Sequence, residues 1–367
     1  MLNLVTFVVT QFAMDITVLI ARYLGEKRPQ YIGQVIGGSI VVFALISAVL
    51  FVVLVGFARP ISVLMQAPEE ALGLTSGYVR ICGAGIFFIV AYNLLAAIFR
   101  GLGDSQSPLL FVLVACIVNV FGDLFLVAGL HLDAAGAAIA TLAAQAASVV
   151  CAVIMLLKKH LPFKLCKADF RLNPQCRKFL SIGLPLALQE FLTQLSFLAL
   201  CAFVNRLGLE ASSGYGVACK IVNFAMLIPS ALMQSMAAFV SQNIGAGSKK
   251  RARQSMFTGI GIGLAFGCAV FANAFAYLKG FAPETIATAV LFSMVGYFNG
   301  NNKTVWVMVQ GLVQTLLVRL PMAYFMSIQP NASLTMIGLA APTSTAVGIV
   351  LNICFYFYFE RTSRSDS

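Results

Sequence analysis

The sequence predicts an all-α polytopic membrane protein built from two homologous helix-bundle lobes. Of the 367 residues, 60% are hydrophobic and only 10% are charged, which excludes an ordinary soluble domain. The apolar stretches are long and continuous, as spanning helices require, whereas barrel strands would alternate. Two motifs also occur twice along the chain. A duplicated helix bundle is the architecture of many secondary transporters, with the solute path between the repeats.

Eleven apolar stretches are long enough to cross a bilayer. Five of them precede a basic linker at residues 158–178, and six follow it. We therefore predict an N-terminal lobe over 1–157 and a C-terminal lobe over 179–367. The predicted spans are 1–21, 31–58, 71–99, 108–130, 134–157, 179–205, 212–241, 255–277, 280–298, 304–326 and 336–358.

The basic residues are distributed unevenly among the predicted loops. One set of alternate loops contains only Arg59, Arg206 and Lys279. The other set, together with the linker and the tail, contains Arg22, Lys27, Arg28, Arg100, Lys158, Lys159, Lys164, Lys167, Arg171, Arg177, Lys178, Lys249, Lys250, Arg251, Arg253, Lys303, Arg361 and Arg364. This is the positive-inside pattern, so the net charge of +11 does not indicate nucleic-acid binding. We predict a cytoplasmic linker and C-terminus. Labelling of a tail cysteine by an impermeant reagent in intact cells would contradict this topology.

The repeated motifs define the internal duplication. Arg22–Arg28 (RYLGEKR) corresponds to Gln242–Arg251 (QNIGAGSKKR). Ile98–Ser105 (IFRGLGDS) corresponds to Tyr297–Thr304 (YFNGNNKT). Each motif lies between apolar stretches, so we expect it to form a short connection between two spanning helices.

The spacing of equivalent glycines predicts two gaps in the repeat. Only 24 residues precede Gly25, whereas Pro185, near the start of a span, lies 60 residues before Gly245. About one helix and its loop are therefore expected to be absent from the front. The interval from Gly245 to Gly300 is 21 residues shorter than the equivalent interval from Gly25 to Gly101, and either a deletion between 254 and 298 or ordinary divergence between the repeats would explain this. We expect these absences to impair transport, because alternating access requires two complete lobes.

At these motifs the chain resembles the multidrug and toxic compound extrusion (MATE) transporters, especially their DinF-like bacterial branch. The segments that carry the resemblance are Ala21–Arg28, Tyr92–Ser105 (YNLLAAIFRGLGDS), Val118–Asp123 (VNVFGD), Ala135–Gln145 (AGAAIATLAAQ), Gly183–Glu190 (GLPLALQE), Val240–Gly247 (VSQNIGAG) and Gly296–Thr304 (GYFNGNNKT). Members usually have twelve spans in two six-helix lobes. The resemblance implies a monomeric, multi-pass protein of the bacterial inner membrane. It would export organic, often cationic, compounds by antiport with H⁺ or Na⁺ and need no other cofactor.

Asp123 is the leading candidate for the ion-coupling residue. It lies within a predicted span, where a bare charge near the bilayer centre costs at least about 2.5–3.5 kcal/mol. Asn119 is four residues earlier and shares its helix face. Carboxylate and amide oxygens suit either reversible protonation or a bound Na⁺. Thr141, on the next, alanine-rich span, can join them. The alternative is a structural polar cluster that holds two helices together.

The resemblance implies the same residues. In the family, an Asn and an Asp at this spacing and a Thr on the next helix form the N-lobe cation site, and they correspond to Asn119, Asp123 and Thr141. The family's fourth member is an acid on the first span, which this chain lacks.

Three further acids are weaker candidates for a cavity or second-lobe site. Glu190 follows Pro185, whose missing N–H exposes backbone polar atoms to a cavity. Some relatives use an acid on this span. Glu284 lies at the end of its span, near a position where relatives often carry an acid. Asp15 is isolated within the first span, where relatives tend to have a small residue. Three bases also remain within spans: Arg80, Lys220 and Arg319.

Other function classes fit less well. The chain has no Gly-x-x-x-x-Gly-Lys-Ser/Thr loop for ATP. Gly101–Asp104 matches the Gly-x-Gly-Asp string of intramembrane aspartyl proteases, but Asp104 falls in a predicted loop and the partner Tyr-Asp string is absent. That chemistry needs two carboxylates that share a proton. We therefore expect a transporter and not an enzyme. A flippase for lipid-linked precursors, from the same superfamily, is the main alternative.

Overall fold

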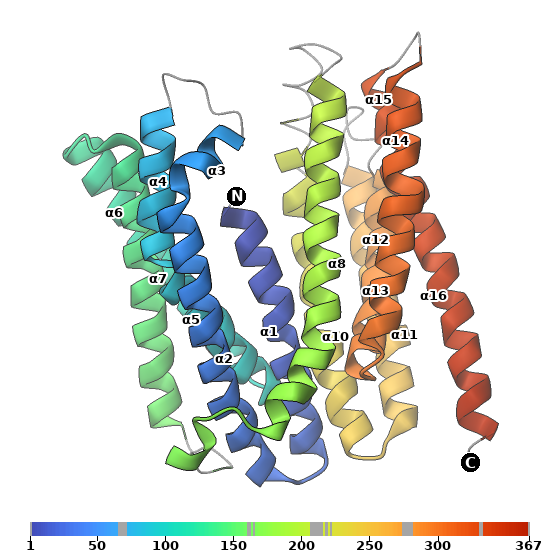
Figure 1. Ribbon diagram of the computed structural model, residues 1–367. Helices are drawn as coiled ribbons and strands as arrows, with labels where there is room; N and C mark the ends of the chain where they lie inside the picture. Colours follow the sequence, from blue (N-terminus) through green and yellow to red (C-terminus); the bar gives the residue numbers. More distant parts are fainter. Residues whose placement is uncertain are drawn as a thin grey trace. The chain divides into compact units, whose positions relative to one another are not determined.

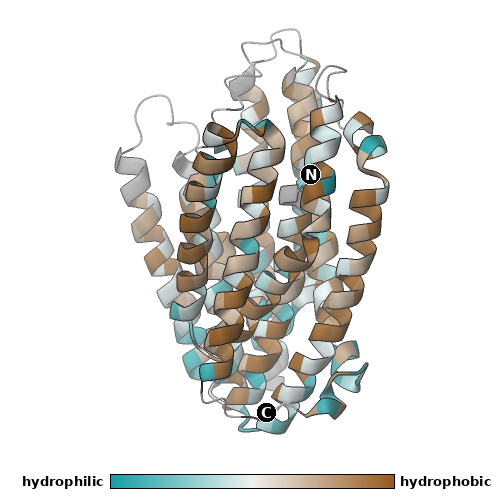
Figure 2. Ribbon diagram, turned by 90° about the vertical axis from the view of Figure 1, so that its left-hand side faces the viewer, coloured by the Kyte–Doolittle hydropathy of each residue, from teal (hydrophilic) through white to brown (hydrophobic). Residues whose placement is uncertain are grey.

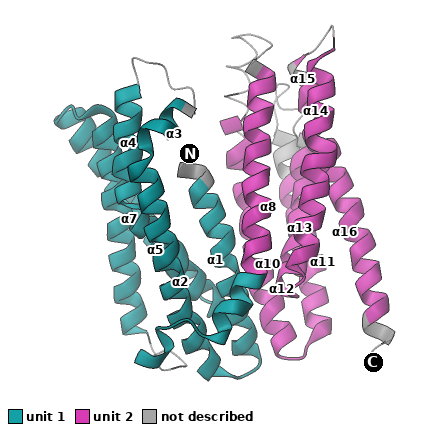
Figure 3. Ribbon diagram, viewed as in Figure 1, with its two compact units in different colours: residues 1–181 teal, residues 182–367 magenta. Residues whose placement is uncertain are grey.

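The fold is helical throughout the part of the chain that the structure describes (Figure 1). A computed structural model describes residues 2–64, 72–159, 163, 166–205, 216, 219–220, 222–273, 282–329 and 333–365. The chain forms two compact units, Met1–Ser181 and Ile182–Ser367 (Figure 3). The boundary lies inside helix α8 (Pro174–Asn205), four residues before Pro185. The predicted class, an all-α membrane protein, is confirmed, while the five-plus-six division of spans stays a prediction.

Unit 1 is built on two extensive helix contacts, α1 against α5 and α6 against α7. Helix α2 packs against both α1 and α5. The elements are α1 (Leu2–Gly25), α2 (Pro29–Gly56), α3 (Ala58–Leu64), α4 (Leu72–Ala84), α5 (Ile86–Gly101), α6 (Gln106–Asp123), the π-helix η2 (Leu124–Gly129), α7 (Asp133–Lys158) and the 3₁₀ turn η3 (Lys167–Asp169).

Unit 2 is organised around α12, which packs against α10, α11 and α16. Helix α16 also packs against the π-helix η5. Besides the remainder of α8, the elements are α10 (Leu227–Gly245), α11 (Lys249–Asn273), α12 (Ala282–Gly300), α13 (Thr304–Leu312), η5 (Val313–Arg319), α14 (Leu320–Ser327), α15 (Leu334–Gly338) and α16 (Ala340–Ser365).

Within the described residues, eight helices are long and apolar enough to cross a membrane, and the bent pair α4–α5 would make a ninth. Hydrophobic residues extend along most of the length of these helices (Figure 2). Many large apolar side chains are exposed to the surroundings, including Leu109, Phe121, Leu157 and Leu317. Such surfaces suit contact with lipid tails, which are as apolar as the side chains themselves. The total of eleven spans stays a prediction, because the predicted spans 212–241, 255–277 and 280–298 include undescribed residues.

Over its described residues, the predicted span 71–99 consists of two helices that together are long and apolar enough to cross a membrane. The helix breaks at Gly85, and its two parts α4 and α5 meet at a bend of 48°. A Cβ built on Gly85 would lie 1.8 Å from Cδ1 of Leu142 on α7. A side chain at this position would therefore displace Leu142. The residues after α2 also differ from the prediction of a loop over Arg59–Glu70, since α3 continues to Leu64.

Both motif pairs form the same turn in the two units. In each, a backbone amide closes the turn by donating to a carbonyl five residues earlier: Arg28 to Tyr23, Ser248 to Asn243, Asp104 to Phe99 and Lys303 to Phe298. The residue before each of these donors has a positive φ: 56° at Lys27, 76° at Gly247, 81° at Gly103 and 59° at Asn302. The sequence repeat therefore has a structural counterpart in backbone conformation.

The helix packing beside these turns also repeats. A Cβ on Gly101 would lie 2.8 Å from Cβ of Ile20, and a Cβ on Gly300 would lie 2.7 Å from Cβ of Val240. Ile20 and Val240 each stand five residues before the glycine of their own turn, Gly25 or Gly245. The helix pairs α1–α5 and α10–α12 thus pack in the same register.

Lys27 is the position where this repeat predicts a gain in stability. A side chain at positive φ is strained, and the equivalent residue in unit 2 is Gly247. Lys27→Gly should raise the free energy of unfolding by about 0.5–1 kcal/mol. Thermal unfolding of the purified chain in detergent measures this. Lys27→Ala is the matched control, because alanine retains the strain, and an equal gain in both variants would contradict the explanation.

Asp104 caps the start of α6 in the short connection after α5. Its Oδ1 accepts from the backbone amides of Gln106 and Ser107 at 3.1 and 3.0 Å, and its Oδ2 accepts from the Ser107 hydroxyl and from the Lys159 ammonium group. Burial alone would raise the pKa of Asp104, but the hydrogen bonds from Lys159 and Ser107 outweigh it and lower the pKa to about 2. Asp104 therefore stabilises the connection between α5 and α6.

The lowered pKa makes the stability contribution of Asp104 pH-dependent. Because the pKa in the folded protein lies below the ordinary value of 3.8, the contribution is complete above about pH 4 and is lost as the pH falls towards 2. At pH 7, Asp104→Asn should cost about 0.5–2 kcal/mol, because asparagine can still accept from the two backbone amides but loses the charge that pairs with the Lys159 ammonium group. The difference from the unaltered protein should shrink as the pH falls to 2. A difference that is constant with pH would contradict this account.

Candidate cation and cavity sites

Asp123 is the last residue of α6 and directly precedes the π-helix η2. Its side chain is half-buried, and its Oδ1 is buried and accepts no hydrogen bond from the described residues. Asn119 lies one turn earlier on α6 and is also half-buried. Helices change from α to π geometry frequently at functional sites. The carboxylate thus stands at a change in helix geometry with an oxygen available to a proton or a cation.

Helix α7 approaches α6 closely beside Asp123. A Cβ on Gly122 would lie 3.0 Å from Cβ of Ala140, so the backbones meet between Asp123 and Thr141. The structure therefore brings together the two helices that carry the predicted site. Within the described residues, however, the Thr141 hydroxyl donates to the Ala137 carbonyl at 2.9 Å, and no hydrogen bond joins Asn119, Asp123 and Thr141. An ion would have to draw their oxygens together.

Sequence reasoning missed two residues near this position. Tyr78 of α4 interacts electrostatically with Asp123. Gln145 lies one turn after Thr141 on α7, and its Oε1 is buried and accepts no hydrogen bond from the described residues. The spacing of four residues could have identified Gln145. Tyr78 gives no such signal, because it comes from a separate helix.

Asp15 on α1 is fully buried, with an exposed fraction of 0%. Neither carboxylate oxygen accepts a hydrogen bond from the described residues. The nearby α1–α5 interface is polar, because the Thr10 hydroxyl donates to Oδ1 of Asn93 at 2.7 Å and the Thr17 hydroxyl donates to the Ala97 carbonyl at 2.9 Å. An ionised carboxylate in such a position is expensive unless a proton, a cation or water compensates it. Asp15 is therefore the second unit 1 acid that could hold a coupling ion.

The two remaining candidates lie in unit 2. Glu190 on α8 is half-buried, and its Oε1 accepts from Nε2 of Gln194 at 2.7 Å. Glu284, in the first turn of α12, is 7% exposed and interacts electrostatically with Arg319. Glu190 thus has a polar neighbour on its own helix, whereas the buried Oε2 of Glu284 accepts no hydrogen bond from the described residues.

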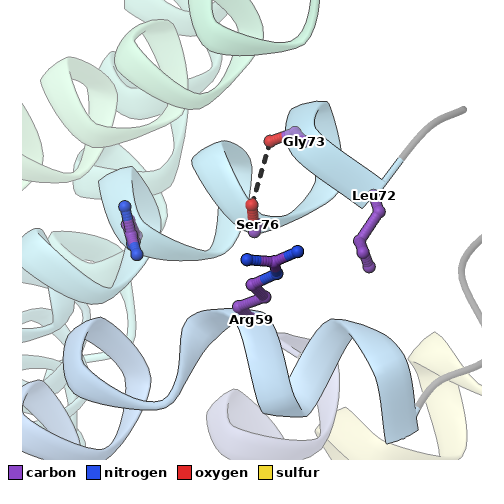
Figure 4. Close-up of a pocket in the computed structure, with 5 residues that line it drawn as sticks. Arg59, Leu72, Gly73 and Ser76 are labelled. Atoms are coloured by element: carbon purple, nitrogen blue, oxygen red, sulfur yellow. Dashed lines mark hydrogen bonds between the residues drawn. The ribbon is translucent and has the colours of Figure 1, made fainter. Parts of the chain in front are cut away.

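A separate cavity of about 390 Å³ lies in unit 1 between α3 and α4 (Figure 4). Arg59 from α3 and Arg80 from α4 line it, together with Leu72, Gly73 and Ser76. Both arginines are exposed. None of the predicted site residues lines this cavity. The exposure of Arg80 is what is expected of a basic side chain that extends from a spanning helix towards a membrane surface.

Comparisons with known proteins indicate a transporter family. The MatE family model matches residues 1–125 and 185–279. The chain is 27% identical to the probable multidrug resistance protein YoeA of Bacillus subtilis over 252 residues, which cover 66% of this chain and 54% of that protein. It is 26% identical to an FAD transporter of Shewanella oneidensis over 215 residues, which cover 57% of this chain and 48% of that protein. The chain therefore spans about half the length of these curated relatives.

A solved structure shares the fold. An outward-facing multidrug resistance transporter of the MATE family, within the MOP superfamily, matches with a TM-score of 0.87 and 17% identity. The match covers 98% of this chain and 85% of that chain. At this identity the likeness concerns the helical architecture alone.

Proposed function

This chain belongs to the MATE family of multidrug efflux transporters, and from that membership we propose that it exports organic, often cationic, compounds by antiport with H⁺ or Na⁺. The proposed coupling residues are Asp123, with Asn119 and Thr141 as its neighbours. The chain would act as a monomer in a bacterial inner membrane, with the linker and the C-terminus in the cytoplasm. The flippase alternative finds no support in the relatives named above, which are described as multidrug or FAD transporters.

The buried Oδ1 of Asp123 is the observation that carries this proposal. It accepts no hydrogen bond from the described residues, so this oxygen is available to a proton or to a cation. The side-chain amide oxygen of Asn119 on α6 and the hydroxyl oxygen of Thr141 on α7 are uncharged. Oxygen ligands of this kind are those that hard cations prefer.

The proposed mechanism uses the cation on Asp123 as the exchanged species. When the site is open to one side of the membrane, Asp123 takes up H⁺ or Na⁺, which neutralises its carboxylate. When the site opens to the other side, release of that ion restores the charge and favours entry of an organic cation. Antiport follows if the coupling ion and the organic cation cannot be bound at the same time, because binding of one then weakens binding of the other.

Reconstitution into proteoliposomes tests this function. With an imposed pH or Na⁺ gradient, ethidium should move against the direction of ion flow, and an ionophore that dissipates the gradient should stop this movement. The matched control is empty liposomes of the same lipid composition. Ethidium movement that continues unchanged after the ionophore would contradict ion-coupled antiport.

A further inference from the structure

Two arginines line one cavity at an end of unit 1. The cavity, of about 390 Å³, lies between α3 and α4 and is lined by Arg59, Leu72, Gly73, Ser76 and Arg80. Figure 4 shows Arg59 extending from α3 towards Ser76 of α4. Both arginine side chains are exposed, and neither forms an ion pair with a described residue. The cavity therefore carries two positive charges that no carboxylate among the described residues neutralises.

The start of α4 adds a second attraction for an anion. This helix has 13 residues and no acid in its first turn, and the preceding Glu69 and Glu70 lie outside the described residues. First-turn N–H groups have no acceptor within a helix, and the helix dipole is positive at that end. Leu72 and Gly73, which begin α4, line the cavity. The Ser76 hydroxyl already donates to the Gly73 carbonyl at 3.0 Å, so the arginines are the main donors.

The surroundings of the cavity suit lipid. Helix α3 follows the end of α2 that is remote from the Arg22–Arg28 turn, and the predicted topology places that end at the outer membrane surface. Large apolar side chains of both helices are exposed beside the lining residues, with Val63 57% and Leu74 58% exposed. Val63 lies four residues after Arg59, on the same face of α3. Basic groups beside exposed apolar side chains match the boundary between lipid headgroups and acyl chains.

We propose that this cavity binds the headgroup of an anionic phospholipid, with Arg59 and Arg80 donating to its phosphate oxygens. A guanidinium group presents paired N–H donors in a plane, a geometry that fits phosphate. The volume of about 390 Å³ falls in the range of roughly 300–1,000 Å³ typical of small-molecule sites, so it accommodates a whole headgroup. The exposed Val63 and Leu74 contact the acyl chains, which a soluble phosphate compound lacks. This lipid site is separate from the proposed antiport and does not depend on it.

Binding of phosphatidylglycerol to the purified full chain in detergent, measured by native mass spectrometry, tests the proposal. Each basic residue near an anionic lipid contributes about fivefold to binding, so Arg59→Gln/Arg80→Gln should raise the dissociation constant about 30-fold. The matched control is Arg177→Gln/Arg251→Gln, which removes the same charge from two exposed arginines outside the cavity and should bind like the unaltered protein. Unchanged binding in the cavity variant, or equal weakening in both variants, would overturn the proposal.

Two other ligands identify the source of the phosphate. Phosphatidylcholine has a zwitterionic headgroup, so its binding should be weak and equal in the unaltered protein and both double variants. A large molar excess of inorganic phosphate should leave phosphatidylglycerol bound, because the free ion gains nothing from the exposed apolar side chains. Displacement of phosphatidylglycerol by an equimolar amount of inorganic phosphate would overturn the assignment to a lipid and would indicate a soluble phosphate compound.

A further variant obstructs the cavity without changing its charge, in case the arginine variant does not fold. A Cβ on Gly73 would meet no atom within 4 Å, so Gly73→Phe can place its ring in open space at the cavity. This variant should lose saturable phosphatidylglycerol binding. Gly261→Phe on α11 is the control, because a Cβ there also meets no atom within 4 Å, and it should retain binding. Full binding by Gly73→Phe would overturn the proposal.

Discussion

Replacing Asp123 by Asn is expected to reduce gradient-driven efflux by about 5- to 150-fold, the range that a coupling free energy of 1–3 kcal/mol gives. An amide has nearly the same shape as the carboxylate, so the close packing of α6 on α7 at Gly122 should survive. An amide cannot exchange a proton or balance the charge of Na⁺. Efflux from cells and from proteoliposomes, compared at equal membrane abundance, measures the loss.

Asp133→Asn is the matched control for this substitution. Asp133 is the first residue of α7, and its side chain is exposed. It lies in the same part of unit 1 as Asp123, just after the connection from α6 to α7. Its φ of 44° is one that asparagine adopts readily. Efflux by Asp133→Asn should therefore remain near that of the unaltered protein. Gradient-dependent efflux by Asp123→Asn at the control's level would refute the assignment of the coupling residue.

Replacing Asp15 by Val is expected to raise the free energy of unfolding by about 1–3 kcal/mol while lowering efflux. The carboxyl group is fully buried and accepts no hydrogen bond from the described residues. A buried polar group without a partner costs about that much, and an apolar side chain of similar size removes the cost. Sites kept for function at the expense of stability show this trade-off.

Asp15→Asn separates charge from polarity at the same position. Asparagine keeps buried polar atoms, so its gain in unfolding temperature should be smaller than that of valine. Thermal unfolding in detergent and efflux at equal abundance are the two measurements. If both variants lower the unfolding temperature, Asp15 stabilises unit 1, and the account of an uncompensated acid is wrong.

The repeat and the helical class could be predicted from sequence because they depend on local pattern. Continuous apolar stretches predict spanning helices, and the paired motifs predict equivalent turns. The equal spacing of Ile20 before Gly25 and Val240 before Gly245 was present in the sequence, and the structure adds that both residues contact the glycine of the next motif. Spacing on one helix likewise places Asn119 and Asp123 on one face.

Contacts between separate helices could not be predicted in this way. Tyr78 interacts electrostatically with Asp123 from a helix that no periodicity relates to α6. The bend at Gly85 depends on where Leu142 packs, which is a property of the assembled bundle. Pro321 gives a local signal for the π-helix η5, but residues 124–129 contain no proline that would predict η2. The change from α-helix to π-helix after Asp123 therefore could not be predicted from the sequence.

Substrate-induced ion release by the purified protein tests the central claim most directly. Binding of ethidium in weakly buffered solution should release about one proton per bound molecule, or displace ²²Na⁺ in the same ratio, because the two occupants exclude each other. The account predicts this release for the unaltered protein and for Asp133→Asn, and no release for Asp123→Asn. Equal release from Asp123→Asn would contradict the claim that Asp123 holds the coupling ion.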